Sequence, residues 1–134
     1  MRRAYRGSCH CGAVQFRCLL DLQAGTSRCN CSICWKGRFW KAIVPATDFE
    51  LLAGDAALAE YRFGSESIRH RFCQHCGIKP FGEGELVELG GHFYAINVAC
   101  LDDVMLDVLL AAPIVYEDGR HDRWDRVPAQ ASLL

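Results

Sequence analysis

Long apolar segments are missing from this sequence. No stretch approaches the roughly 18 uninterrupted apolar residues that a membrane-spanning helix needs, so no membrane contact is expected. The basic start, residues 1–8, has no apolar run behind it, and a secretory signal would need one. We therefore expect an intracellular, cytoplasmic protein.

An excess of one charge is missing as well. The formal net charge is −1, and strong attraction to nucleic acid requires a clear basic excess, so no nucleic-acid partner is expected. The sequence also contains no Ser-His-Asp arrangement, phosphate-binding loop or dinucleotide-binding glycine motif. The usual signatures of hydrolases and nucleotide-dependent enzymes are therefore absent.

Internal repeats, low-complexity tracts and long linkers are absent too, so the length of 134 residues suits a single domain over residues 1–134. Helical periodicity is weak, and short helical turns are expected only within 55–60 and 101–110. Alternating or β-branched runs between glycine and aspartate turns predict strands within 14–18, 38–44, 49–52, 58–63, 68–72 and 92–99. The predicted fold is mainly β.

Cysteine, in contrast, is abundant, with nine residues in the chain. The number is odd and no secretory signal is expected, so disulfides explain these cysteines poorly. In a reducing cytosol, closely spaced thiols are better explained as metal ligands. Two of the nine, Cys18 and Cys100, stand alone in strand-like surroundings and are interpreted as small buried hydrophobic residues.

The other seven cysteines form three clusters, CHCG at 9–12, CNCSIC at 29–34 and CQHCG at 73–77. Zinc bound by thiolates takes four ligands in a tetrahedron. Gly12 and Gly77 each follow the second cysteine of a pair, where glycine permits a positive φ and relieves crowding around an ion. Seven thiols cannot fill two four-ligand sites, so we predict a division into four and three.

The predicted closed, structural zinc site joins two pairs that are distant in sequence, Cys9 and Cys11 with Cys73 and Cys76. The predicted second site takes three ligands from one continuous loop, Cys29, Cys31 and Cys34. Its fourth position would be free for water or substrate, as catalytic zinc requires. Two alternatives are a second structural zinc closed by His10 or Asn30, and an iron–sulfur cluster, although the ferredoxin cysteine spacings are absent.

These motifs resemble those of the glutathione-dependent formaldehyde-activating enzyme family, which also contains centromere protein V. The resemblance extends from about residue 5 to about residue 128. The segments that carry it are GSCHCGAV at 7–14, CNCSIC at 29–34, FCQHCGI at 72–78 and NVACLDD at 97–103.

The resemblance implies a zinc-binding β-tent fold with two zinc ions and the same division of the cysteines into four structural and three catalytic ligands. It implies a carbon–sulfur lyase that joins formaldehyde to glutathione and yields S-hydroxymethylglutathione. The expected partners are therefore a small thiol and an aldehyde. The alternative is a non-catalytic zinc-binding module for protein interaction, like centromere protein V.

Glutathione carries carboxylates, so its pocket should offer cations. Three basic residues follow the cysteine triplet and are candidates: Lys36, Arg38 and Lys41. Three aromatic residues in the same stretch would either wall the pocket or belong to the core: Trp35, Phe39 and Trp40.

Overall fold

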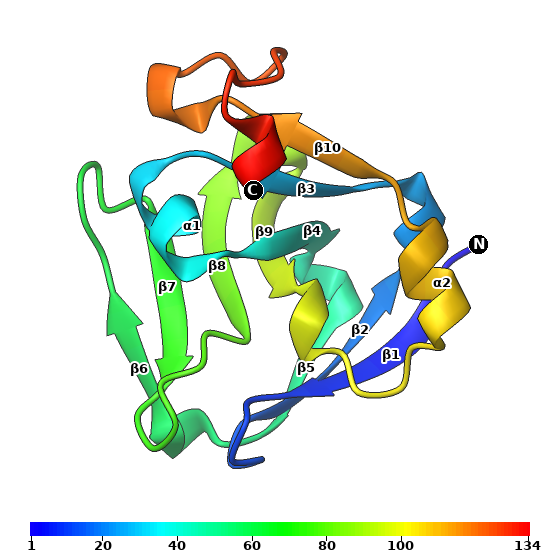
Figure 1. The fold of residues 1–134 in the computed structure, drawn as a ribbon. Coiled ribbons are helices and arrows are strands. Elements are labelled where there is room, and N and C mark those ends of the chain that lie inside the picture. Colours follow the sequence, from blue (N-terminus) through cyan, green and yellow to red (C-terminus); the bar gives the residue numbers. More distant parts are fainter.

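The computed structural model describes residues 1–134 and contains ten strands and two helices (Figure 1). The strands are β1 (Arg3–Ser8), β2 (Gln15–Leu20), β3 (Thr26–Cys29), β4 (Trp40–Pro45), β5 (Phe49–Ala53), β6 (Leu58–Tyr61), β7 (Ile68–Cys73), β8 (Phe81–Leu86), β9 (Gly91–Asn97) and β10 (Ile114–Glu117). The helices are α1 (Ser32–Gly37) and α2 (Leu106–Ala111). Neither helix has the length and apolar character that crossing a bilayer demands.

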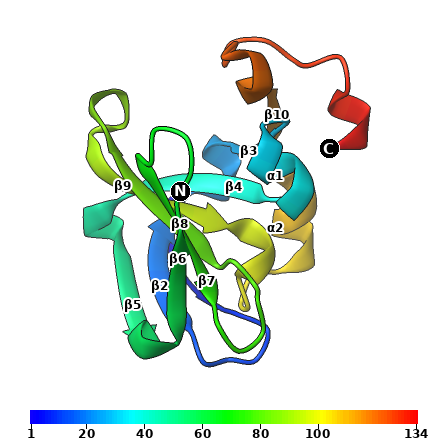
Figure 2. The ribbon, with the colours of Figure 1, turned by 90° about the vertical axis from the view of Figure 1, so that its left-hand side faces the viewer.

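The strands form two sheets. The smaller sheet has the order β1-β2-β5, and the larger has the order β10-β3-β4-β9-β8-β7-β6. Every pairing is antiparallel except that of β10 with β3, which is parallel. Figure 2 shows β2 and β5 on one side of the molecule, with α1, α2 and the C-terminal segment on the other.

The main core contains residues from both sheets. On β2, Phe16 and Cys18 are buried while Gln15 and Arg17 are exposed, so the alternation seen in the sequence reflects a strand with one covered face. Phe81 and Ile96 of the larger sheet are equally buried in the same cluster. Each such side chain stabilises the fold by about 1.5–3 kcal/mol relative to its exposed state.

The mainly β prediction is confirmed, and each predicted run overlaps a strand. The two expected helical turns are present as α2 and a 3-10 turn at Asp55–Ala57. Four strands lie outside the predicted runs: β1, β3, β8 and β10. Of these, β8 contains two glycines, Gly82 and Gly84, and lacks the apolar alternation of β2. A Cβ at position 84 would lie 2.7 Å from Ile68 Cδ1 and 3.0 Å from the carbonyl oxygen of Ser67, so glycine avoids a crowded contact there.

The C-terminal segment is tied to the edge of the larger sheet. β10 pairs with β3 in a register that places Glu117 beside Cys29. In Figure 1 the chain then continues, in orange and red, across the side of the molecule that carries β3 and α1. The cysteine triplet therefore lies where this segment meets the sheet.

Candidate metal centres

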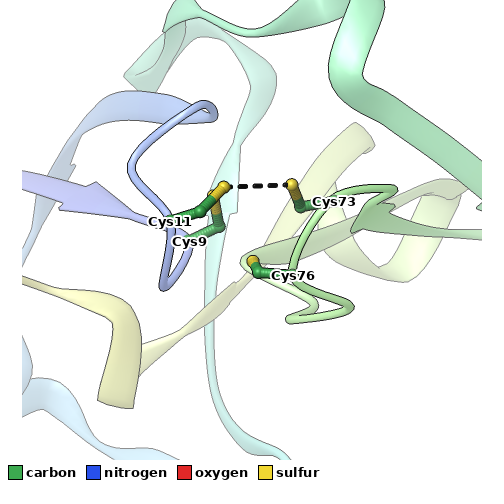
Figure 3. Close-up of side chains that lie close together, drawn as sticks. All are labelled: Cys9, Cys11, Cys73 and Cys76. Carbon is green, nitrogen blue, oxygen red and sulfur yellow. Dashed lines mark hydrogen bonds between the residues drawn. The ribbon is translucent and has the colours of Figure 1, made fainter.

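The first candidate centre is a cluster of four cysteines drawn from two turns (Figure 3). Cys9 and Cys11 lie in the turn after β1, Cys73 ends β7, and Cys76 lies in the turn that follows. All four sulfur atoms lie within 4.8 Å of one another. The sulfur of Cys11 lies 3.6 Å from that of Cys9 and 3.6 Å from that of Cys73.

The geometry of this cluster fits tetrahedral zinc. A Zn–S bond of about 2.3 Å places the sulfurs of a tetrahedral site about 3.8 Å apart, close to the observed separations. The donor set is also suitable, because four thiolates form a common closed zinc site in proteins. The four residues predicted to assemble from distant parts of the sequence are therefore brought together by the fold.

Backbone groups around the cluster favour thiolates. The amide of Val14 donates to Cys9 Sγ at 3.3 Å, and the amide of His75 donates to Cys73 Sγ at 3.4 Å. Backbone hydrogen bonds, led by that of Ile78, lower the pKa of the Cys76 thiol to about 6. The cluster is thus prepared to bind a cation.

The glycines after each pair have the predicted conformation. Gly12 has a φ of 82° and Gly77 a φ of 78°. The amide of Gly77 donates to the carbonyl of Cys73 at 2.8 Å, which closes the turn that presents both sulfurs of this pair. A residue with a side chain would be strained at either position.

The second candidate centre is the cysteine triplet, and here the structure corrects one expectation. The three ligands do not come from a continuous loop. Cys29 ends β3, Cys31 is the N-cap of α1, and Cys34 lies within that helix. The amide of Cys31 donates to Cys29 Sγ at 3.4 Å. The helix α1 was not predicted because its six residues are too few to show a 3.6-residue period.

The three thiols of the triplet interact but do not form a second group at the ligand spacing of the first cluster. Hydrogen bonding with Cys29 and Cys34 lowers the pKa of Cys31. Hydrogen bonding with Cys29 and Cys31, together with burial, raises the pKa of Cys34. In the absence of metal, one negative charge is shared among the three neighbouring sulfur atoms. A divalent metal would favour the thiolate form of all three, so the donor set fits zinc.

Neither residue proposed to close the triplet is available in this arrangement. Asn30 is fully buried, and its amide donates to Asp118 Oδ1 at 2.8 Å while its side-chain oxygen accepts from the amide of Arg120 at 3.0 Å. His10 is exposed in the turn of the four-cysteine cluster. The alternative of a closed second structural site therefore finds no support from these two residues.

The C-terminal segment covers the triplet closely. A Cβ on Gly119 would lie 2.5 Å from Cys29 Sγ and 2.6 Å from a ring carbon of Trp124. The Trp124 ring lies 5.8 Å from Lys41 Nζ, which also forms an ion pair with Glu117 at 2.8 Å. Only glycine can occupy position 119 beside this sulfur without displacing its neighbours.

The cations beside the triplet are only partly those predicted. Lys36 is exposed, and the exposed Arg38 donates to the carbonyl of Leu133 at 2.6 Å. Lys41 is half-buried, and although burial lowers its pKa, attraction to Glu117 and to the thiols of Cys34 and Cys29 raises it overall. Lys41 is therefore the one of the three that acts electrostatically on the triplet.

A second lysine near these thiols was not predicted from the sequence. Lys79 lies in the turn before β8, with Nζ 2.6 Å from His70 Nδ1 and 4.3 Å from the centre of the Phe39 ring. Burial lowers its pKa to about 8, against the attraction of Cys34 and Cys31. Lys79 is 45 residues from Cys34 in the sequence, and only its position just after the third cysteine motif could have drawn attention to it.

The aromatic residues after the triplet divide between wall and core. Phe39 is buried in a small cluster against which Cys34 packs. Trp40 is half-buried and donates from Nε1 to Thr26 Oγ1 at 2.7 Å. A small surface depression beside the triplet is lined by Arg28, Cys29, Cys34, Arg38, Phe39 and Leu134. Cys29 and Cys34 border this depression, which is too shallow to hold a water molecule.

Comparison with known proteins agrees with this arrangement. Residues 4–115 match the family described as "Glutathione-dependent formaldehyde-activating enzyme". The fold is similar to the crystal structure of a Rhodobacter sphaeroides protein, with a TM-score of 0.68 and 32% sequence identity. The similarity covers 82% of this chain and 99% of that protein.

Proposed function

The chain belongs to the glutathione-dependent formaldehyde-activating enzyme family, and on that premise we propose that it is a zinc-dependent carbon–sulfur lyase acting on a small thiol and an aldehyde. Glutathione and formaldehyde are the substrates that the family description suggests. The triplet of Cys29, Cys31 and Cys34 is the proposed catalytic centre, and the four-cysteine cluster is the proposed structural centre.

The contrast between three and four thiols supports this assignment most directly. The four-cysteine cluster has a complete tetrahedral donor set, which leaves no position for a substrate. The triplet offers three thiols, and the buried Asn30 beside it is engaged with Asp118 and Arg120. A centre with three protein ligands keeps a position open, as catalytic zinc sites do.

A Zn²⁺ ion held by the triplet would supply a position at which a substrate thiol binds and loses its proton. The remaining work belongs to the residues around it. Lys41, held by Glu117 at 2.8 Å, contributes positive charge next to the thiols of Cys29 and Cys34. Gly119 packs against the sulfur of Cys29, where a side chain would not fit, and Trp124 lies against the same position.

The proposed reaction needs no oxidant or reductant. The S–H bond of the thiol breaks, a bond forms between sulfur and the carbonyl carbon, and the electron pair of the carbonyl π bond moves to oxygen. That oxygen then takes the proton released by the thiol. Binding the thiolate beside the aldehyde would accelerate the step chiefly by proximity and by ionisation of the sulfur.

We also propose that the protein works in the cytoplasm, where its thiols remain reduced. All nine cysteines are free, and seven of them lie in the two candidate centres. Oxidising conditions would convert such neighbouring thiols to disulfides and remove the metal ligands.

The test is to follow the metal when a thiol is added. Cobalt-substituted protein should change its ligand-field bands on addition of glutathione, and the zinc-edge spectrum should shift towards a higher number of sulfur neighbours. Cys31→Ser, which removes one triplet ligand, should lose this response. If neither glutathione nor another small thiol alters the metal in the wild-type protein, the enzyme proposal fails and a non-catalytic protein-interaction module becomes the better interpretation.

A further inference from the structure

Lys79 is held in a defined position rather than extended into solvent. Its Nζ lies 2.6 Å from His70 Nδ1 and 4.3 Å from the centre of the Phe39 ring. An ammonium group only donates hydrogen bonds, so Nδ1 of His70 must be the acceptor and carry no proton. Phe63 stacks on His70 with ring centres 5.5 Å apart, which fixes the acceptor in turn.

Among the three lysines of the chain, Lys79 is the one with a half-buried charge and no carboxylate partner. Lys41 is paired with Glu117, Lys36 is exposed, and Lys79 has a neutral imidazole and an aromatic face as its neighbours. A sheltered cation without an anion is costly, unless an anion binds nearby.

The triplet supplies that anion. Phe39, over which Lys79 lies, belongs to the same small cluster that contacts Cys34. The charge of Lys79 also attracts the thiolates of Cys34 and Cys31. Lys79 therefore lies on the triplet's side of the turn between β7 and β8, while Lys41 approaches the triplet from β4 and shares its charge with Glu117.

We infer that Lys79, oriented by His70 above Phe39, is the residue that makes the triplet centre prefer an anionic sulfur ligand. This inference rests on the proposed function. Zn²⁺ with three thiolates has a net charge of −1, and a fourth thiolate makes it −2, which is unfavourable without a nearby cation. The half-buried charge of Lys79, which has no carboxylate partner, offsets that increment. Lys79 thus determines which ligand class is bound.

The test compares two probes on cobalt-substituted protein at one pH. 2-Mercaptoethanol binds as an anion through sulfur and has no carboxylate, and imidazole binds as a neutral ligand. Lys79→Met should weaken 2-mercaptoethanol binding by about tenfold or more, since one nearby charge is lost, and change imidazole binding by less than about twofold. Subtracting the spectrum of Cys31→Ser from the spectrum of each other protein, recorded with the same probe, isolates the signal of the triplet.

Two further variants sharpen the result. Lys79→Arg keeps the charge and should retain most of the thiol affinity, whereas Lys36→Met removes an exposed lysine and should bind both probes as wild type does. Equal weakening of both probes would overturn the inference, because the variant would then have damaged the site as a whole. Loss of glutathione binding alone, with 2-mercaptoethanol unaffected, would also overturn it and assign Lys79 to a substrate carboxylate.

The inference and the proposed function fail in different ways. If wild-type protein binds no thiol at all, the proposed function fails and the inference fails with it. If wild-type protein binds 2-mercaptoethanol and Lys79→Met binds it equally well, the proposed function stands and the role of Lys79 is refuted.

Discussion

The four-cysteine cluster joins two turns that are 62 residues apart, at Cys11 and Cys73, whereas the triplet comes from six consecutive residues, 29–34. A metal in the first position connects the end of β1 to the end of β7 and so restrains most of the chain. A metal in the second position connects β3 to the helix that directly follows it. The first is therefore expected to govern folding, and the second is free to exchange a ligand without endangering the fold.

The largest effect should come from breaking the long-range cluster. Cys76→Ser removes one of four ligands, and structural zinc sites contribute on the order of 10 kcal/mol to the folding of small zinc domains. We expect the variant to unfold or aggregate, as measured by thermal unfolding and by zinc content. A soluble variant that unfolds cooperatively at the wild-type temperature would refute the structural role of this cluster.

A smaller loss is expected where the C-terminal segment meets the triplet. Gly119→Ala places a Cβ 2.5 Å from Cys29 Sγ and should cost about 1–3 kcal/mol of unfolding free energy, since neighbours must shift. The variant should also bind thiols more weakly. Gly37→Ala is the matched control, because a Cβ there has no atom within 4 Å. Equal denaturation midpoints for the two variants would show that the segment does not pack on the triplet in solution.

Breaking the triplet itself should change the metal content far more than the stability. Cys31 is the N-cap of α1 and makes no capping hydrogen bond, and serine is a better N-cap, so Cys31→Ser should alter stability by less than about 1 kcal/mol. Zinc content should fall from roughly between one and two ions per chain to about one. A melting temperature that falls as far as that of Cys76→Ser would remove the distinction between the two centres.

The smallest effect concerns pH. Hydrogen bonds from Asn30 and His121 hold the pKa of Asp118 below its usual value. A lowered folded-state pKa means that this stabilisation is present above the unfolded pKa and is lost as pH falls through the folded one. Wild-type protein should therefore have a higher melting temperature than Asp118→Asn at neutral pH, and this difference should narrow below about pH 4. A difference in melting temperature that stays constant across this pH range would exclude the ionised form of Asp118 as the stabilising one.

Short-range features of this protein were predictable from the sequence, and long-range ones less so. The two pairs of the four-cysteine cluster could be predicted because two closely spaced cysteines and the following glycine indicate a local turn, and Gly12 and Gly77 have the positive φ of such a turn. The strand β8 could not, because it lacks an apolar alternation and because Gly84 reflects a close approach of Ile68 and Ser67 that the sequence does not reveal.

The surroundings of the triplet show the same limit. Lys41 is near the triplet in sequence and was predicted, whereas Lys79, Gly119 and Trp124 reach it through strand order and the parallel pairing of β10 with β3. No spacing rule connects residues 29–34 to a turn 45 residues later or to a C-terminal segment. Their approach depends on topology, which a pattern of single residues does not contain.

The separation in sequence between the two halves of the four-cysteine cluster also determines when the cluster can assemble during translation. Cys11 leaves the ribosome 62 residues ahead of Cys73, which at about 5–20 residues per second is a delay of about 3–12 s. During that interval the first pair has no partners, and a metal bound by two thiols alone is held weakly. If the cluster binds zinc as proposed, the nascent chain needs a reducing environment until residue 76 has been made and the metal can be bound by all four thiols.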